Sequence, residues 1–581
     1  MFIRPINVRK NGKDHSYWSL VESYRTSHGP RQRTVSYLSE LDAAGRLGVQ
    51  SAAEEQSHKR RAGQRGLFDN TEPRWVEVDT KRVRVENVRD FGGYWLGLEL
   101  IKSIGLDRFL AKAIPAGRES VSWSEMVQVL ILCRLNFPSS ELHIAEHLYD
   151  ASGLEYLLGL PSSVVDDNRL YRALDALLPH KESLEVFLKE KLGNLFELDY
   201  DIVLYDVTSV YFEGEAKRNP QAKRGYSRDK RFDCKQVCIA LVVSREGIPF
   251  GYEVFDGNRN DVTTVREIVE KVESRYGKSR RIWCLDRGMI SEETVKFLRA
   301  EGRRYIVGTP RSMLKRFERE LLADSWQEIY EGLEVKSCQS PEGGEIFVLC
   351  RSRARREKES AIHCRFENRI ESGLKEIEAD CNRRKRDPLV IAKNVGKLLG
   401  RNSRSAGLFK VEIRQGEGGR ARLKWRKVES WREWANRSEG CYLLRSNVTD
   451  WSAQDLWGAY IQLTQAENAF RIQKSDLKIR PVWHQKGERV HAHILVCFLA
   501  YVLWKSLAQL CKRAGIGDEP RRVFDEIGRI KTVDVILPTR EGNEIRLRCV
   551  AEPTKRQRVL IERLGLYLPR RLRTRKCSEN F

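Results

Sequence analysis

The chain has 581 residues, of which 41% are hydrophobic and 9% aromatic, so it has enough apolar side chains for packed cores and is not a disordered chain. Its 104 Lys and Arg outnumber its 81 Asp and Glu, and the formal net charge of +23 favours a polyanion such as nucleic acid as partner, with an ordinary basic protein as the alternative. The longest apolar run, residues 494–504, is too short to span a bilayer, so we expect a buried helix there and no membrane partner.

The first third of the chain falls into two parts. Residues 1–48 alternate between apolar and polar positions, which predicts a small β-hairpin module, and the polar residues 50–66 predict a linker. We therefore assign residues 1–66 to a small β module and linker. Residues 67–198 show apolar spacings of three and four with Ser or Asn at plausible caps, which predicts a helical region, the expected DNA-binding part of the protein.

The middle of the chain alternates short apolar strands with amphipathic helices. Residues 199–309 follow the order β-β-β-α-β-α-β, which predicts an α/β fold in which helices cover a mixed sheet. Residues 310–440 contain hairpin-like pieces around a charged helical stretch, so we expect a β-rich insertion subdomain. Residues 441–510 return to the core with a helix at 460–474, and residues 511–581 form a C-terminal region of unassigned role.

Three acids stand where we expect side chains to leave the core. Asp206 is predicted at the end of the first core strand, Asp286 at the end of the fourth, and Glu467 on the 460–474 helix. If these elements are neighbours, three carboxylates converge, and crowded like charges must be protonated or hold cations; hard divalent ions prefer such oxygen ligands. Taken singly, an Asp after a strand is usually a turn or cap residue, and Glu467 is more simply an i, i+4 ion-pair partner of Arg471.

The helix predicted at 460–474, "YIQLTQAENAFRIQK", places its polar groups in a pattern. Tyr460, Glu467 and Lys474 are seven residues apart, so they fall on nearly one face of a helix, in a stripe roughly 21 Å long with Arg471 beside it. Glu467 would complete a metal site, and Tyr460 and Lys474 would bind nucleic-acid phosphates on either side of it.

These segments together resemble a known family. The order of elements resembles the ribonuclease-H-like fold, and the acids resemble the D-D-E set of bacterial insertion-sequence transposases. Residues 460–474 resemble the Y-(2)-R-(3)-E-(6)-K signature of the insertion-sequence-four superfamily, in its longer branch with an N-terminal hairpin, and "GYSRDKRFDCKQV" and "LDRGMIS" resemble further blocks of it. Leu463 stands where the signature has Arg, and we expect it to pack on the apolar flank with Ala466 and Phe470 while Arg471 supplies the cation.

The resemblance implies a cut-and-paste transposase. It would bind the terminal inverted repeats of its element, hydrolyse the DNA strand at each end, and join the freed 3′-hydroxyl to target DNA, with two Mg²⁺ or Mn²⁺ ions held by Asp206, Asp286 and Glu467. In this superfamily the β-rich insertion helps to hold a flipped base, so Trp425 and Trp431, with the nearby Trp434, are candidates to stack on DNA; core packing is the alternative for each of them.

The resemblance also sets the expected partners and location. Double-stranded DNA is the partner, as terminal repeats and as target, and paired ends imply a homodimer in a synaptic complex. We expect a cytoplasmic, nucleoid-associated protein, since the thirteen cysteines lack a C-x-x-C pair or a regular disulfide framework.

Two other classes of function are open from the sequence. "HIAEH", residues 143–147, matches the H-x-x-E-H pattern, so His143, Glu146 and His147 would define a zinc protease, although an amphipathic helix is the simpler interpretation. A catalytically retired transposase that still binds DNA is the other alternative, and the intact acids count against it.

Overall fold

The computed structural model describes residues 2–10, 13–26, 29–38 and 76–572, apart from 118, 120, 279, 341–342 and 416–420. The predicted linker at 50–66 lies outside these residues. The chain divides into two compact units: Met1–Val83 with Leu537–Ile545, and Arg84–Ile536 with Arg546–Phe581. The second unit contains the predicted core.

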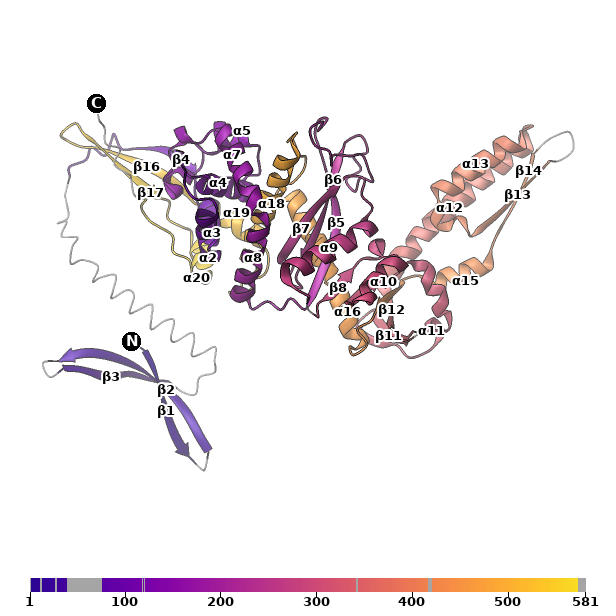
Figure 1. The fold of residues 1–581 in the computed structure, drawn as a ribbon, viewed down its shortest axis with the longest axis horizontal. Helices are drawn as coiled ribbons and strands as arrows, with labels where there is room; N and C mark the ends of the chain where they lie inside the picture. The colour runs from indigo at the N-terminus through magenta and orange to yellow at the C-terminus, as the bar shows by residue number, and fades with distance from the viewer. Residues whose placement is uncertain are drawn as a thin grey trace. The chain divides into compact units, whose positions relative to one another are not determined.

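The amino-terminal strands form a small antiparallel sheet (Figure 1). Its three strands, in the order β1-β2-β3, are β1 (Phe2–Lys10), β2 (Lys13–Thr26) and β3 (Gly29–Leu38). β2 pairs antiparallel with both β1 and β3, so the hairpin that the alternating pattern predicts is extended by a third strand.

The helical region is built around one almost fully buried helix, α4 (Trp123–Asn136). Ser122 starts this helix by accepting a hydrogen bond from the backbone N–H of Glu125, and nearly every residue that follows is buried, so α4 lies at the centre of the region. The helices around it are α2 (Gly92–Ile104), α3 (Leu106–Ala113), α5 (Glu141–His143), α6 (Leu154–Leu158), α7 (Asp167–Leu177) and α8 (Lys181–Phe196).

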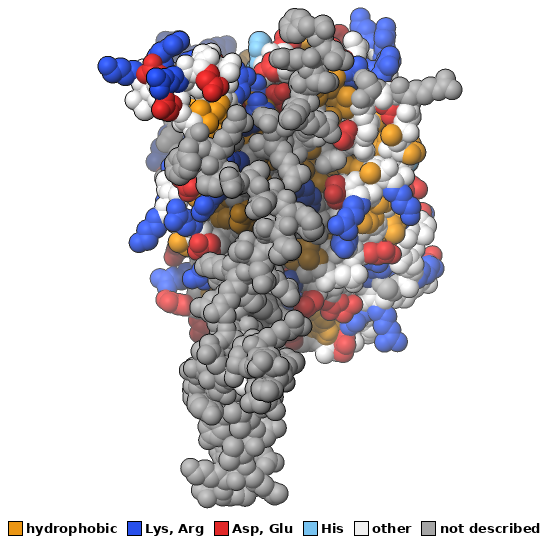
Figure 2. Space-filling model, turned by 90° about the vertical axis from the view of Figure 1, so that its left-hand side faces the viewer, with side chains coloured by type: hydrophobic (Ala, Val, Ile, Leu, Met, Phe, Trp, Pro, Cys, Tyr) orange, Lys and Arg blue, Asp and Glu red, His pale blue; other side chains and the backbone are white. Residues whose placement is uncertain are grey.

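A strand that the helical pattern does not predict opens this unit. β4 (Arg84–Asp90) pairs antiparallel with β16 (Lys531–Pro538), and β17 (Glu544–Val550) completes a sheet in the order β17-β16-β4. Helices α19 (Pro520–Ile527) and α20 (Lys555–Arg563) accompany it. On the side of the molecule seen in Figure 2, Lys and Arg side chains lie beside Asp and Glu wherever described residues are visible, so this face carries mixed charge.

A nine-stranded mixed sheet forms the centre of the second unit, in the order β10-β11-β12-β15-β9-β8-β5-β6-β7. Strand β5 runs parallel to β8, and β8 runs parallel to β9, while β6 and β7 are antiparallel additions. Their bounds are β5 (Ile202–Tyr211), β6 (Gln236–Val243), β7 (Pro249–Asp256), β8 (Ile282–Leu285) and β9 (Arg304–Gly308), with the helices α9 (Asp261–Tyr276) and α10 (Glu292–Ala300). This is the β-β-β-α-β-α-β order that the sequence predicts.

Helices cover both faces of the sheet, which explains why strands such as β6 are buried throughout instead of alternating. On one face Tyr205 and its odd-numbered neighbours pack with α9 and α10, and on the other Leu204 and its even-numbered neighbours pack with α17 (Leu463–Ser475) and α18 (Gly487–Arg513). α18 is long and apolar enough to cross a membrane by composition, but 83% of its most apolar window is buried, so it is a core helix here.

The insertion differs from the β-rich subdomain that the sequence predicts. Its outer strands extend the main sheet: β10 (Gln327–Tyr330), β11 (Leu333–Gln339), β12 (Ile346–Ser352) and the returning β15 (Cys441–Ser446). Most of the remainder is helical: α12 (Arg353–Arg383), α13 (Pro388–Arg401), α14 (Ser403–Ala406) and α15 (Glu429–Ser438), with one hairpin of β13 (Phe409–Gln415) and β14 (Ala421–Lys427).

The helix α12 explains the difference. It is 31 residues long but buries only Ile370, Leu374 and Cys381, so its apolar stripe is too sparse to indicate one long helix. Ion pairs four residues apart, such as Glu371 with Lys375, support its exposed surface. We call residues 353–438 the arm; Figure 1 shows α12, α13, β13 and β14 lying beyond the sheet strands β11 and β12.

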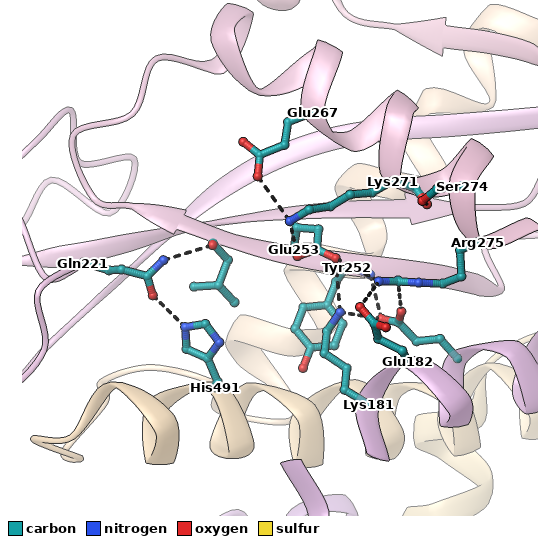
Figure 3. Close-up of polar contacts among 12 residues, drawn as sticks. Lys181, Glu182, Gln221, Tyr252, Glu253, Glu267, Lys271, Ser274, Arg275 and His491 are labelled. Atoms are coloured by element: carbon teal, nitrogen blue, oxygen red, sulfur yellow. Dashed lines mark hydrogen bonds and ion pairs between the residues drawn. The ribbon is translucent and has the colours of Figure 1, made fainter. Parts of the chain in front are cut away.

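A buried ion network joins the helical region to the sheet (Figure 3). Glu185 of α8 is fully buried and pairs with Lys181 of its own helix and with Arg275 of α9. Glu253 of β7 pairs with both of those cations and with Lys271. Charges removed from water are stable only when they are paired in this way, so the network fixes how α8 sits against the sheet.

Candidate active site

Asp206 and Asp286 lie side by side because their strands run parallel. The register of β5 with β8 places Tyr205 opposite Leu285, and the two acids are the next residues of their chains. Leu204 belongs to the core cluster that contains α17 and α18, so the alternation of side chains directs Asp206 to that same face. β8 ends at Leu285, so Asp286 leaves the sheet at the start of a short 3-10 turn.

The position of Asp206 corrects one expectation. Asp206 lies inside β5 rather than at its end, because the antiparallel partner β6 stays paired from Leu204 to Tyr211 and keeps the strand extended. The side chain of Asp206 is reachable because β8, the neighbouring strand on the other side of β5, ends at Leu285, opposite Tyr205.

The helix that carries Glu467 is anchored by its apolar flank. Leu463, Ala466 and Phe470 are buried at 8%, 0% and 5% exposure, which confirms that Leu463 packs where the family signature has Arg. Glu467 lies one turn along α17 from Leu463, at the edge of this flank, and is exposed. Since α17 packs directly against β5, its exposed acid faces the ends of the core strands.

The three acids line one cleft. Its volume is about 150 Å³, and its lining residues are Tyr205, Asp206, Asp286, Tyr460, Ile461, Leu463, Thr464 and Glu467. Burial, the largest cause, and the neighbouring carboxylates of Asp286 and Glu467 together raise the pKa of Asp206 to about 7, against the opposing effects of the Val207 N–H and Arg228. The cleft therefore concentrates negative charge at a partly buried position.

The residues in this cleft fit a hard divalent cation. All three acids offer carboxylate oxygens, the ligands that Mg²⁺ and Mn²⁺ prefer, and a bound cation would remove the repulsion that raises the pKa of Asp206. Crowded carboxylates that stay ionised need such a counter-charge. Asp206, Asp286 and Glu467 are accordingly candidate metal ligands by their chemistry, but they are not among the described groups whose ligand atoms all lie within 4.8 Å of one another.

The predicted stripe of Tyr460, Glu467 and Lys474 is interrupted. The helix is interrupted at Gln462, which separates α16 (Ala453–Ile461) from α17. Tyr460 therefore lies on a different helix from the other two residues. The Tyr460 hydroxyl donates a hydrogen bond to Asp286 Oδ1 at 3.3 Å. Burial and the Asp286 carboxylate both raise the pKa of Tyr460, so its hydroxyl stays protonated and orients that acid.

Lys474 has a protein partner at the other end of the helix. Its ammonium donates to both carboxylate oxygens of Asp229, at 3.1 and 3.2 Å, and Arg480 pairs with the same acid at 3.1 Å. Burial lowers the pKa of Lys474 although Asp229 opposes the shift. Arg471 is exposed and donates to Asn468 rather than pairing with Glu467.

A larger cavity of about 840 Å³ adjoins the acid cleft. Asp286 and Glu467 belong to its lining, together with residues of the arm and the extended sheet that include Trp431, Trp434 and Tyr442. Trp425 does not line it: its indole N–H donates to Glu378, and its ring packs on Phe409 in the core of the arm.

The "HIAEH" segment has no metal-site geometry. His143, Glu146 and His147 are exposed on a short helix that continues as a π-helix, and none of the clusters of three possible metal ligands among the described residues includes them. The cluster that does occur is buried and consists of Glu141, His484 and His493.

That buried cluster is a hydrogen-bonded network rather than a free ligand set. His493 Nε2 faces the Ile479 carbonyl at 3.1 Å, and its Nδ1 faces Arg134 at 3.4 Å, so both ring nitrogens are used. Burial lowers the pKa of His493 to about 3, which keeps the ring neutral. Glu141 pairs with His484 at 3.4 Å, and the nearby guanidinium of Arg134 further disfavours a cation.

The fold and the acid cluster define the class of protein: an α/β core with a carboxylate triad drawn from distant segments. The sequence model of the transposase DDE domain matches residues 197–503, more than half of the chain, and that of the IS1634 family transposase N-terminal domain matches residues 3–66. The chain therefore belongs to the DDE transposases, of the IS1634 type, which are enzymes that cleave and transpose DNA.

Other comparisons are more distant. The sequence matches no curated protein. Among solved structures, the piggyBac transposase synaptic complex with hairpin DNA is similar at a TM-score of 0.36 and 9% sequence identity, covering 78% of this chain and 82% of that chain.

Sequence reasoning missed Asp229. It lies in the block "GYSRDKRFDCKQV", where acids and bases alternate and no single residue stands out. In the folded chain it is the shared partner of Lys474 and Arg480, which are 245 and 251 residues away along the chain. Only the folded structure brings these three residues together.

Proposed function

We propose that this protein is a cut-and-paste DDE transposase. It binds the terminal inverted repeats of its element, cleaves DNA at the ends, and joins the 3′-hydroxyl to target DNA. The observation that supports this proposal is the convergence of Asp206, Asp286 and Glu467 on one cleft in a chain of the DDE transposase family.

The catalytic core is proposed to be ribonuclease-H-like. The strand order β7-β6-β5-β8-β9, with β5, β8 and β9 parallel and two antiparallel strands at one edge, supports this assignment. In this arrangement the insertion interrupts the core between β9 and α17, so the third acid arrives only after the arm has been traversed.

Two Mg²⁺ or Mn²⁺ ions are the proposed cofactor, held by the three carboxylates. Bound there, the ions supply activation of the attacking oxygen and stabilisation of the leaving oxygen of a phosphodiester. The chain's own part is positioning: the register of β5 with β8 fixes the two Asp side chains, and the Tyr460 hydroxyl holds Asp286. The buried flank of α17 fixes Glu467 above them.

The residues around the acids are suited to hold DNA. Lys474 and Arg471 lie on the same helix as Glu467 and are proposed to contact phosphates, with Asp229 keeping Lys474 in place until a phosphate replaces it. The adjoining cavity is within the size range of ligand sites, so Trp431 and Trp434 are proposed to stack on a base flipped from the DNA end. Trp425 lies in the core of the arm, so its position does not support this role.

The active form is proposed to be a homodimer that pairs two element ends in a synaptic complex. Duplex DNA is then bound both as terminal repeats and as target. The proposed location is the cytoplasm, at the nucleoid.

The test is strand cleavage of linear duplex DNA that carries the element's own ends, with Mn²⁺ or Mg²⁺ added. Asp286→Asn should keep DNA binding and lose cleavage by at least about 10³-fold, because metal-assisted charge stabilisation supplies several kcal/mol. Chelation of the ions should abolish cleavage in the native protein. Asp525→Asn, which neutralises an exposed acid of α19, is the matched control and should cleave normally.

The outcomes separate the alternatives. Unchanged cleavage by Asp286→Asn would remove that residue from the mechanism. End binding by the native protein with no cleavage in either metal would identify a catalytically retired transposase. A zinc protease would need His143 and His147, which are exposed and have no third ligand among the described residues.

A further inference from the structure

The net charge of the protein is concentrated in the arm. Residues 383–427 contain fifteen Lys and Arg and three Asp and Glu, a net charge of +12 and more than half of the +23 of the whole chain. This segment includes the end of α12, all of α13 and the hairpin of β13 and β14. Residues 383–427 therefore carry a large excess of positive charge, whereas Lys and Arg lie among Asp and Glu on the face seen in Figure 2.

The hairpin of β13 and β14 has one apolar and one charged face. Phe409, Leu423 and Trp425 point inward and pack with α12 and α13 in the core of the arm. The opposite face, which we call the ribbon face, is exposed and consists of Lys410, Glu412, Arg414, Arg422, Lys424 and Arg426. Because the core fixes the inner face, the orientation of the ribbon face is fixed as well.

Like charges are directly opposed on the ribbon face. Lys410 pairs across the strands with Arg426, and Arg414 pairs with Arg422, so two of the three cross-strand pairs on this face are cation with cation. Directly opposed like charges destabilise a hairpin by about 0.2–1 kcal/mol each. This cost persists in the free protein and is removed when an anion lies across both strands.

The ribbon face also lacks the internal pairing of an ordinary solvated surface. On α12, in the same arm, Lys375 pairs with Glu371, and Lys427 at the end of the hairpin reaches Glu367 and Glu371. Within the residues that the structure describes, only Arg414 of the five ribbon-face cations has an acidic partner, Glu412 at 3.0 Å. The cations of this face that have no acidic partner within the protein are available to bind an external anion.

A second row of cations lies on α13. Lys393, Lys397 and Arg401 are four residues apart and exposed, so they form one stripe along this helix, which contains no acidic residue. The arm therefore presents unpaired cations on two elements that share one apolar core.

We propose that the ribbon face of the arm is a binding surface for duplex DNA, contacted through its phosphates. Successive side chains on one face of a strand are about 6.8 Å apart, and the two strands about 5 Å, so β14 offers a row of three cations and β13 offers one cation on either side of Glu412. Each strand of DNA carries one phosphate per about 3.4 Å of helix axis, which supplies an anion for every cation of such a row. Side chains of this kind bind the backbone without reading bases, so the contact does not depend on sequence. The surface is separate from the acid cleft and does not depend on its chemistry.

The test uses the full-length protein in an Asp286→Asn background, so that no cleavage step is involved. The neutralised variant carries Lys410→Gln, Arg422→Gln and Arg426→Gln, and the matched control carries Lys410→Arg, Arg422→Lys and Arg426→Lys. The probe is a linear duplex of random sequence, titrated by fluorescence anisotropy between 50 and 200 mM salt. The neutralised variant should bind about tenfold to a hundredfold more weakly at 100 mM salt, with a salt slope reduced by about 0.9 for each phosphate that the protein no longer neutralises. The control should bind as the parent does.

Several results would overturn the proposal. Equal affinity and equal salt slope for the neutralised variant and the control would exclude phosphate binding at the ribbon face. Polyglutamate that competes as well as duplex DNA at matched charge would show a general polyanion surface instead. Thermal unfolding of the neutralised variant should match or exceed that of the control, because relief of opposed charges favours the hairpin; a lower unfolding temperature would assign the weaker binding to misfolding and refute the proposal.

Discussion

The central sheet and the arm carry their charges in opposite ways. In the network of Glu185, Arg275 and Glu253, charged groups are largely removed from water and paired, and in the acid cleft the half-buried Asp206 lies beside two exposed carboxylates. On the ribbon face of the arm, the cations are exposed, two cross-strand pairs set cation against cation, and only Arg414 of these cations has an acidic partner among the described residues. A buried charge must be balanced within the protein, whereas an exposed like-charge row can be left for a ligand to balance.

This difference shows which part of the sequence determines each surface. The acid cleft takes its three carboxylates from β5, the end of β8 and α17, so every one of them depends on the tertiary fold. The ribbon face needs only local alternation in two adjacent strands. Chemistry that must place atoms accurately is built from the rigid core, and backbone binding, which tolerates displacement, is built on a local hairpin.

The largest expected effect tests the buried side of this comparison. Glu185→Gln leaves Arg275 and Lys181 with less counter-charge in a buried place, so the free energy of unfolding should fall by about 3 kcal/mol. Urea unfolding of the full-length protein measures it. Glu182→Gln is the matched control, since Glu182 pairs with the same Arg275 at 3.0 Å but is 78% exposed, and should lose about 0.5 kcal/mol or less. Equal losses for the two variants would break the distinction between buried and exposed charge.

A smaller effect is expected at Lys474, a largely buried cation that is paired with Asp229 and is also proposed to bind a phosphate. Asp229→Asn leaves the largely buried Lys474 without its counter-charge, and the unfolding free energy should fall by about 2 kcal/mol, less than for a fully buried pair. Duplex DNA should then restore stability more in Asp229→Asn than in the native protein, because a phosphate can take the place of the carboxylate. Thermal unfolding with and without DNA measures this. If Lys474→Met in the same background left the gain unchanged, Lys474 would not be the phosphate ligand.

The smallest expected effect lies on the ribbon face. Lys410→Glu converts the Lys410–Arg426 pair into an attractive one and should stabilise the hairpin by about 0.2–1 kcal/mol. Amide hydrogen exchange in β13 and β14 should slow by up to about fivefold while DNA affinity falls. Lys410→Gln should give an intermediate rate. Faster exchange in Lys410→Glu than in the parent would show that opposed cations do not strain the hairpin.

Local pattern was enough to predict much of the core. Period-two and period-four spacings between residues 202 and 308 gave the strands and helices in their observed order, and the charge of the chain indicated its polyanionic partner. The packing of Leu463 followed from its place beside Ala466 and Phe470. Each of these depends on neighbours within a few turns of the chain.

What the sequence could not predict depends on distant partners. The break at Gln462, the extended backbone at Asp206 and the strand β4 are set by contacts with other elements rather than by local propensity. The role of Asp229 depends on its contact with Lys474 of α17, which only the folded chain provides. The ribbon face was within reach of sequence reasoning, because "KVEIR" and "RLKWR" alternate charged and apolar residues on either side of a turn.

The pairing of β4 with β16 has a consequence for synthesis in the cell. Asp90 of β4 and its partner Lys531 are 441 residues apart, so a ribosome that adds about 5–20 residues per second exposes β4 for roughly 20–90 s before β16 exists. Until then β4 has no strand partner on either edge. A message cut short before its final stretch would therefore yield a polypeptide whose helical region is never closed, so an interrupted gene copy would yield a product open to proteolysis instead of a partly active enzyme.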